Sequence, residues 1–258
     1  MAKRKIEGNF VKFLGTAGAR FVMIKQLRAS GGIWVSSKGT NILIDPGPGS
    51  IVRCSIAKPK LNPSELDAVI LTHKHLDHAN DINVMIEAMT EGGFKKRGIV
   101  FCPKYALEGD SIILRYARKF LKRIEILKPN ARYRVGNFSF QASMRHLHTA
   151  EAYGIKFKIN GNTFGLLADT RYFKDLEDFY KVDTLIISVV FLKKHPGIDH
   201  LSLEEAKKII SAIRPKRALL THFGMNMLKA NPSLQAKRLS KEIGVKVDAA
   251  YDGLLIRP

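Results

Sequence analysis

The sequence predicts an α+β protein in which two packed β-sheets are flanked by helices. Short runs rich in Val, Ile, Leu and Phe recur along the chain, and Gly, Asn, Pro or Asp bounds most of them, as is typical of strands. Helical patterns are fewer, and they do not alternate regularly with the strand-like runs. This order argues against a doubly wound parallel sheet and favours two sheets packed against each other.

The expected strands are short and spread over most of the chain: 10–14, 32–35, 41–44, 68–71, 99–101, 138–142, 154–159, 163–168, 184–190, 218–220 and 254–256. Four stretches are expected to be helical: 81–89, 111–124, 203–213 and 233–243. Ser202 and Glu205 form a capping-box pattern at the start of the third helix. Gly244 follows the fourth helix, where glycine commonly ends one.

Composition narrows the class of protein. The chain has 258 residues without repeats or a Ser/Pro-rich linker, which favours a single domain over residues 1–258. Two cysteines exclude a disulfide scaffold and suit a reducing compartment. The N-terminal ten residues have no apolar core of a secretion signal, and no run approaches a membrane span. We therefore expect a cytoplasmic protein without a membrane partner.

Three of the eight histidines lie within six residues, directly after the apolar run 68–71. The segment contains His73, His75, Asp77 and His78, so a strand that ends there would carry several ligands at one point. Imidazole and carboxylate groups bind zinc and related transition metals. With this many donors in one turn, the segment predicts a metal site that can hold two adjacent ions.

This segment resembles the signature of the metallo-β-lactamase superfamily of dinuclear hydrolases. Four further motifs of that superfamily are matched in order, each at the end of an apolar run: Asp45 in NILIDPG, His148 in HTAEAYG, Asp169 in LLADT and His222 in LLTHF. The resemblance covers nearly the full length. It implies a four-layer αββα sandwich with the metal ions at one edge.

The resemblance also implies a role for each matched residue. His73, His75 and His148 would hold one metal ion, and Asp77, His78 and His222 the other, with Asp169 bridging the two. Asp45 would orient a ligand histidine, as carboxylates commonly do. The expected cofactors are two divalent ions, with zinc favoured and manganese as the alternative. His146 competes with His148, because alternate residues of one strand share a face.

The expected reaction is metal-assisted hydrolysis. Two bridged metal ions can hold a hydroxide and lower the pKa of water to roughly 7, so no protein nucleophile is needed. The superfamily's classical lactamases carry Cys where this chain has Asp169, which argues against antibiotic hydrolysis. His200, in HLSLEEA, resembles the histidine of the phosphodiesterase branches that positions phosphate and assists the leaving group. The predicted catalytic residues are His200, Asp77 and Asp45.

The formal net charge of +20 is unevenly distributed. Residues 1–60 carry +9 and residues 91–134 carry +8, whereas the histidine-rich region 61–90 carries −4. A basic surround favours an anionic substrate, and Arg115, Arg118, Lys119, Lys122 and Arg123 on the expected helix 111–124 would suit contacts to RNA. The expected partners are an anionic small molecule and, as an alternative, RNA; a homodimer is also an expectation.

The leading hypothesis is therefore a phosphodiesterase for a small cyclic or linear phosphodiester. One alternative is an RNA endonuclease similar to ribonuclease Z, although the long Gly/Pro-rich insertion by which that enzyme grips transfer RNA is missing. Another is a thioester or lactone hydrolase similar to glyoxalase II. A metal-stabilised RNA-binding protein without catalysis is the remaining possibility. The segment 15–20 is expected to form a turn bordering the site.

Overall fold

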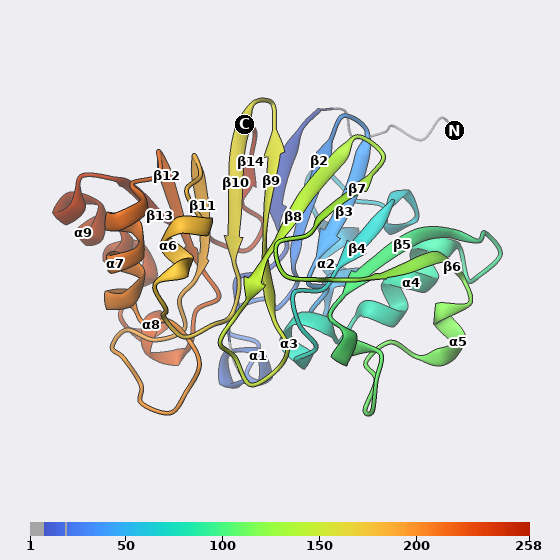
Figure 1. The fold of residues 1–258 in the computed structure, drawn as a ribbon, viewed down its shortest axis with the longest axis horizontal. Helices are drawn as coiled ribbons and strands as arrows, with labels where there is room; N and C mark the ends of the chain where they lie inside the picture. The colour runs from blue at the N-terminus through green and yellow to red at the C-terminus, as the bar shows by residue number, and fades with distance from the viewer. Residues whose placement is uncertain (1–7, 19) are drawn as a thin grey trace.

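The computed structural model describes residues 8–18 and 20–258, and two seven-stranded sheets form its centre (Figure 1). The first sheet has the order β14-β1-β2-β3-β4-β5-β6. Its strands are β1 (Phe10–Phe13), β2 (Ile33–Ser37), β3 (Thr40–Ile44), β4 (Ala68–Ile70), β5 (Arg97–Cys102), β6 (Leu121–Ile126) and β14 (Leu255–Ile256). The pairs from β14 to β3 are antiparallel, and those from β3 to β6 are parallel.

The second sheet repeats this plan with the order β13-β12-β11-β10-β9-β8-β7. Its strands are β7 (Arg132–Val135), β8 (Phe138–Arg145), β9 (Tyr153–Ile159), β10 (Asn162–Leu167), β11 (Thr184–Ser188), β12 (Arg217–Thr221) and β13 (Lys246–Ala249). Strands β7 to β10 pair antiparallel, and β10 to β13 pair parallel. Each sheet is therefore mixed, with one antiparallel and one parallel part.

Helices lie outside both sheets (Figure 1). The first sheet is accompanied by α2 (Ser50–Ile56), α4 (Ile82–Thr90) and α5 (Arg115–Arg118), and the second by α6 (Asp175–Phe179), α7 (Leu203–Ile213), α8 (Met225–Lys229) and α9 (Pro232–Ile243). The short helices α1 (Phe21–Ile24) and α3 (Leu76–Ala79) lie at the lower edge of Figure 1. Short 3-10 turns occur at Pro63–Glu65 and Lys104–Ala106.

Three separate apolar cores hold the layers together. One lies between the sheets, with Phe13, Ile44 and Phe157 among its buried members. A second joins the first sheet to its helices and includes Trp34, and a third joins the second sheet to α7 and α9. Three cores separate four layers, so the structure confirms the αββα sandwich. In the described part of the chain, no helix is long and apolar enough to cross a bilayer.

Local sequence signals located the longer helices. The Ser202 hydroxyl caps α7 by accepting from the Glu205 amide, and the Glu205 carboxylate accepts from the Ser202 amide, so the predicted capping box is present. Gly244 adopts the left-handed conformation after α9, as its position predicted. The helix expected at 81–89 is α4. The expected absence of a secretion signal concerns residues 1–10, of which 1–7 lie outside the described residues.

The prediction of a helix over residues 111–124 is wrong. Only the single turn α5 forms there, and the chain then enters β6, which pairs parallel with β5. Ile113 and Ala117 are buried as the helical spacing required, but Ile124 joins the sheet instead. Arg118 donates to the carbonyls of Ile113 and Leu107 and closes a compact turn. The continuous basic helix face proposed for RNA therefore does not exist.

Strands β6, β7 and β13 were missed as well. Each has charged residues at alternate positions, as Arg132 and Arg134 in β7 illustrate, so hydrophobic content alone does not reveal it. β6, β7 and β13 are edge strands, and an edge tolerates charge on its exposed side.

Candidate metal centre

Segments from both sheets meet at one edge of the sandwich, each at the carboxyl end of a strand. The first sheet contributes Asp45 after β3 and the histidine-rich loop after β4. The second contributes His148 after β8, Asp169 after β10 and His222 after β12. Asp45 and His222 have positive φ angles of 52° and 60°, a conformation in which the backbone turns sharply off the strand.

His73, His75 and His148 form the first candidate metal group, and their ligand atoms lie within 4.8 Å of one another. His148 Nε2 lies 3.1 Å from His75 Nδ1. Two imidazole nitrogens bound to one tetrahedral zinc ion lie about 3.3 Å apart, so this separation suits a shared ion. The structure brings together the three residues that the sequence assigned to the first metal.

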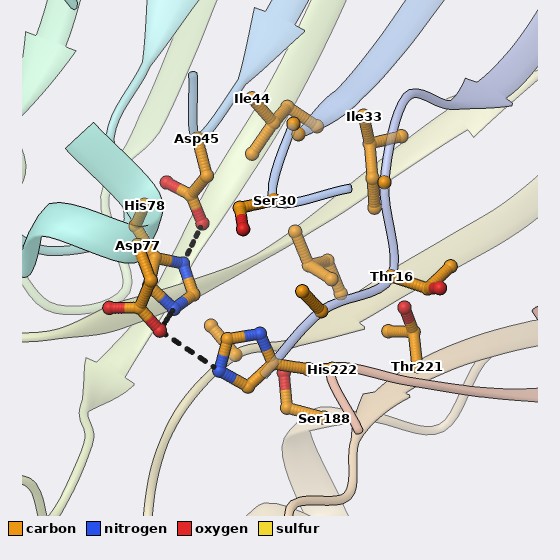
Figure 2. Close-up of a pocket in the computed structure, with 16 residues that line it drawn as sticks. Thr16, Ser30, Ile33, Ile44, Asp45, Asp77, His78, Ser188, Thr221 and His222 are labelled. Atoms are coloured by element: carbon orange, nitrogen blue, oxygen red, sulfur yellow. Dashed lines mark hydrogen bonds and ion pairs between the residues drawn. The ribbon is translucent and has the colours of Figure 1, made fainter. Parts of the chain in front are cut away.

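Asp77, His78, Asp169 and His222 form the second group. His222 Nε2 is 3.2 Å from Asp169 Oδ2 and 3.5 Å from Asp77 Oδ2, and His78 Nε2 is 3.3 Å and 3.6 Å from the same atoms. Figure 2 shows Asp77, His78 and His222 pointing toward one another. These distances also match the edges of a tetrahedron around one ion.

Asp169 connects the two groups. Its Oδ2 lies 3.9 Å from His73 Nε2 as well as beside the second group, and the residue is 1% exposed. Burial alone would raise its pKa, but the histidines His222, His200 and His78 lower the pKa well below its usual range. The carboxylate is therefore ionised in a place shielded from water, which is where a bridging ligand is expected.

Several of the candidate ligand atoms have no hydrogen-bond partner in the described part of the chain. Among the described residues, His73 Nε2, His78 Nε2, His222 Nε2 and both carboxylate oxygens of Asp169 are buried without a hydrogen-bond partner. Buried polar atoms without partners cost free energy, and their convergence on one point is accounted for by a bound cation. The donor set of histidine and aspartate fits two divalent transition-metal ions.

Asp45 orients a histidine from each group. It accepts from the Thr72 amide and hydroxyl, both at 2.7 Å, and the Thr72 hydroxyl then accepts from His73 Nδ1 at 3.0 Å. Asp45 also lies 3.0 Å from His78 Nδ1, which donates to it. Both imidazoles are left with Nε2 available for a metal. Thr72 was missed from sequence, although a hydroxyl next to His73 was a usable signal.

The structure shows different roles for His146 and His148. The ring nitrogens of His146 lie 3.2 Å from the Asp169 carbonyl and 3.0 Å from the Tyr180 hydroxyl, so both have partners away from the cluster. His148 donates from Nδ1 to the Asp199 carbonyl at 3.0 Å and keeps Nε2 for the cluster. His146 instead fixes the main chain of Asp169, which makes it a positioning residue.

His200 joins the cluster from the second sheet's side. Its Nδ1 lies 3.4 Å from Asp169 Oδ2, and it forms a third possible group with His148 and Asp169. The segment that carries it is fixed, because Leu203 donates to Phe191 and Ser202 begins α7. His195, on the same loop, is exposed and lies against Phe191 instead.

A small cavity of about 50 Å³ lies beside the second group, and Asp77, His78 and His222 form part of its lining (Figure 2). Thr16, Ser30 and Thr221 line it together with His222, and the buried Ser30 hydroxyl has no partner. Gly15 and Ala17 also line it, so the segment 15–20 borders the site as predicted; Ala19 lies outside the described residues. Gly18 is required here, because a Cβ would lie 2.2 Å from the His222 carbonyl.

Removal of metal is expected to lower the melting temperature. Burial lowers the pKa of His75 to about 4, so this ligand is neutral and ready to bind metal at pH 7. At a free zinc concentration 1,000 times Kd, one site stabilises the fold by about 4 kcal/mol. For a chain of this size that corresponds to a rise of roughly 10 °C over chelator-treated protein in a thermal melt.

Calcium is the matched control cation for that melt, because it prefers oxygen ligands and should leave the temperature unchanged. A melting temperature that did not respond to zinc or manganese would contradict the predicted site.

Comparison with known proteins gives a family match. A protein-family model described as "Beta-lactamase superfamily domain" matches residues 40–223. The "Uncharacterized protein MJ1374" of Methanocaldococcus jannaschii is 29% identical over 253 residues, which cover 95% of this chain and 93% of that protein. "Ribonuclease Z" of Thermococcus kodakarensis is 35% identical over 98 residues, which are 38% of this chain and 30% of that enzyme.

Solved structures share the fold at low sequence identity. The metallo-β-lactamase fold protein YhfI of Bacillus subtilis superposes with a TM-score of 0.78 at 21% identity, covering 97% of this chain and 99% of that one. A diphosphatase from the PhnP family gives 0.71 at 17% identity, with 96% of each chain covered. Zinc-bound PqqB of Methylobacterium extorquens gives 0.75 at 16%, covering 96% of this chain and 100% of that one.

Proposed function

Since the chain belongs to the metallo-β-lactamase superfamily, we propose that it is a metal-dependent phosphodiesterase acting on a small cyclic or linear phosphodiester. The family and the His/Asp cluster indicate a metallo-hydrolase. The finer assignment depends mainly on one observation. His200 lies beside Asp169 at the edge of the cluster, where it can contact the substrate without being needed for either complete metal group.

His200 has the surroundings of a phosphate-binding acid. Burial lowers its pKa in the protein alone, while the neighbouring Asp169 carboxylate raises it. A phosphodiester anion bound beside the ring would add negative charge and favour the protonated form. Protonated His200 could then donate to a phosphate oxygen and deliver a proton to the departing alkoxide, a contribution of about 10²–10⁴-fold in rate.

The other residues of the site would hold the metal ions or orient their ligands. His73, His75 and His148 would hold one ion and Asp77, His78 and His222 the other, with Asp169 between them. Divalent ions bound there would polarise the phosphoryl group and lower the pKa of water. Zinc-bound PqqB has the same fold, which supports zinc as the first metal to test. Asp45 keeps two of the histidines in the orientation that exposes Nε2.

A substrate panel tests this proposal on the metal-loaded protein. It contains bis-aryl phosphate, cyclic phosphates, dinucleotides, S-acyl glutathione, a lactone and precursor transfer RNA. We expect turnover of the small phosphodiesters, and loss of that turnover in Asp77→Ala. Turnover of S-acyl glutathione or the lactone without any phosphodiester would overturn the proposal in favour of a glyoxalase II-like hydrolase.

RNA remains a second candidate substrate, because an open strand face is strongly basic. Arg132, Arg134 and Lys158 are exposed on β7 and β9, and Arg132 pairs through Gln141 with Lys156 in one row across the sheet. We call these four cations the basic strand face. The only acidic residue between 132 and 158 is Glu151, and β8 leads from this face to His146 and His148.

If RNA is the substrate, reversing charge on this face should weaken its binding. Arg132→Glu with Arg134→Glu is expected to reduce RNA affinity at least tenfold at 0.1 M salt, and to lower the salt dependence by about 0.7 per lost phosphate contact. Lys237→Glu with Arg238→Glu on exposed positions of α9 makes the same charge change elsewhere. Equal losses in both double variants would exclude a specific role for the basic strand face.

A further inference from the structure

A lysine lies in the interior of the first sheet. Lys12 is the third residue of β1 and is only 3% exposed. It is directly opposite Trp34 across the antiparallel pair, and its neighbours on the same face, Phe10 and Leu14, belong to the core between this sheet and its helices. Lysine is rarely buried to this extent without a charged partner, so this position needs an explanation.

The partners of Lys12 are neutral. Its ammonium donates to the carbonyls of Lys58 and Gly253, each at 3.0 Å. Arg53 lies nearby and donates from Nε to the Leu14 carbonyl at 3.0 Å. Across residues 8–18 and 20–258, no carboxylate lies within 4.0 Å of either cation. Burial and the charge of Arg53 both lower the pKa of Lys12, which indicates uncompensated positive charge.

The two cations line a cavity of about 280 Å³. Its apolar walls are formed by Leu14, Ile56 and Ala57. The main chain of Lys58 and Gly253, whose carbonyls accept from Lys12, completes the lining. Ile56 and Lys58 are exposed, so the cavity opens to solvent beside α2. It is near the lower end of the size range of ligand pockets, about 300–1,000 Å³. None of the predicted metal ligands lines it.

We propose that this cavity is a binding site for a small oxoanion, a phosphate ester or carboxylate with a compact apolar group. The ammonium of Lys12 has a third N–H beyond its two carbonyl bonds, and the guanidinium of Arg53 has donors beyond Nε. An anion between them would supply the missing negative charge, and the apolar walls would contact the rest of the ligand. The site is separate from the proposed hydrolysis and does not depend on it.

Trp34 provides a direct measurement. It is the only tryptophan in the chain, and side chains directly opposite across an antiparallel pair have Cβ atoms about 4.5–5.5 Å apart. Titration of the metal-loaded protein with inorganic phosphate, phenyl phosphate and benzoate, at constant ionic strength set with chloride, should change Trp34 fluorescence in a saturable way. The three probes separate phosphate from carboxylate recognition and show whether the apolar group adds affinity.

Two variants decide the result. Lys12→Met keeps the length of the side chain and removes the charge, and Arg53→Gln removes the second cation. Each is expected to raise the apparent Kd at least tenfold, whereas Lys60→Met, an exposed lysine nearby, should not change it. Hydrolysis of bis-aryl phosphate should stay within about twofold of the wild-type rate, because anion bound at the metal centre is not affected.

Lys12→Met should also melt at the same or a higher temperature without ligand, since an unpaired buried charge is removed. The proposal fails if the wild type shows no saturable response to any probe, or if both variants respond like the wild type. If Lys12→Met does not fold, Arg53→Gln alone gives the decision.

Discussion

Replacing Asp169 with alanine is expected to abolish hydrolysis and to reduce the bound metal. Among residues 8–18 and 20–258, Asp169 is the one carboxylate that lies within 4 Å of histidines from both candidate metal groups. Its loss would remove the ligand proposed to bridge the two ions and would leave Asp77 as the remaining carboxylate beside His78 and His222. Loss of metal-ion charge stabilisation is worth several kcal/mol, so the rate should fall by about 10³-fold or more.

The measurement combines metal content with the rate on bis-aryl phosphate from one sample. Asp169→Asn keeps the shape of the side chain and should be nearly as inactive, because the charge is what the bridging role requires. Asp175→Ala, at an exposed position of α6, is the matched control and should retain full metal content and rate. An Asp169→Ala protein that kept both metal ions and most of its activity would refute the bridging role.

Replacing His200 with alanine is expected to have an effect that depends on the leaving group. If His200 delivers a proton to the departing oxygen, a diester with an alkoxide leaving group should lose about 10²–10⁴-fold in kcat/KM. A 4-nitrophenolate leaving group needs little protonation, so the same variant should lose less than about tenfold on that substrate. The metal content should not change, because His200 belongs to neither of the two groups that are proposed to hold the ions.

His195→Ala is the control for this comparison, because His195 is exposed on the same loop. It should be close to wild type on both substrates. Equal losses on the two substrates would show that His200 positions the phosphate without transferring a proton. No loss on either would remove the main support for a phosphodiesterase and would return the thioester and lactone hydrolases to first place.

The sequence located the cluster because four of its five segments directly follow apolar strands. The runs before Asp45, His73, Asp169 and His222 are buried on both faces, and such runs are visible in the sequence without any knowledge of pairing. The lack of regular alternation between strand-like runs and helices favoured two packed sheets, and the resemblance to the superfamily implied the four-layer sandwich. The metal-binding roles of these residues are still predictions, although the structure brings their ligand atoms together.

Features that depend on tertiary contacts were not accessible in this way. The family resemblance favoured His148 over His146, but the contact that occupies His146 is with Tyr180, which is distant in sequence. The segment 111–124 has the spacing of a helix, but pairing with β5 determines its structure. In the sequence, Lys12 is indistinguishable from an ordinary exposed lysine of a strand. Its burial depends on the packing of α2 and of the loop at Gly253.

The arrangement of the two sheets has a consequence for folding. The first sheet carries His73, His75, Asp77 and His78, and the second carries His148, Asp169 and His222. Each metal group takes members from both, so neither sheet alone can complete a site. Ions bound there would therefore act as cross-links between the two halves of the sandwich. An opening that separates the sheets would then have to release metal, and metal binding would favour the closed, fully docked molecule.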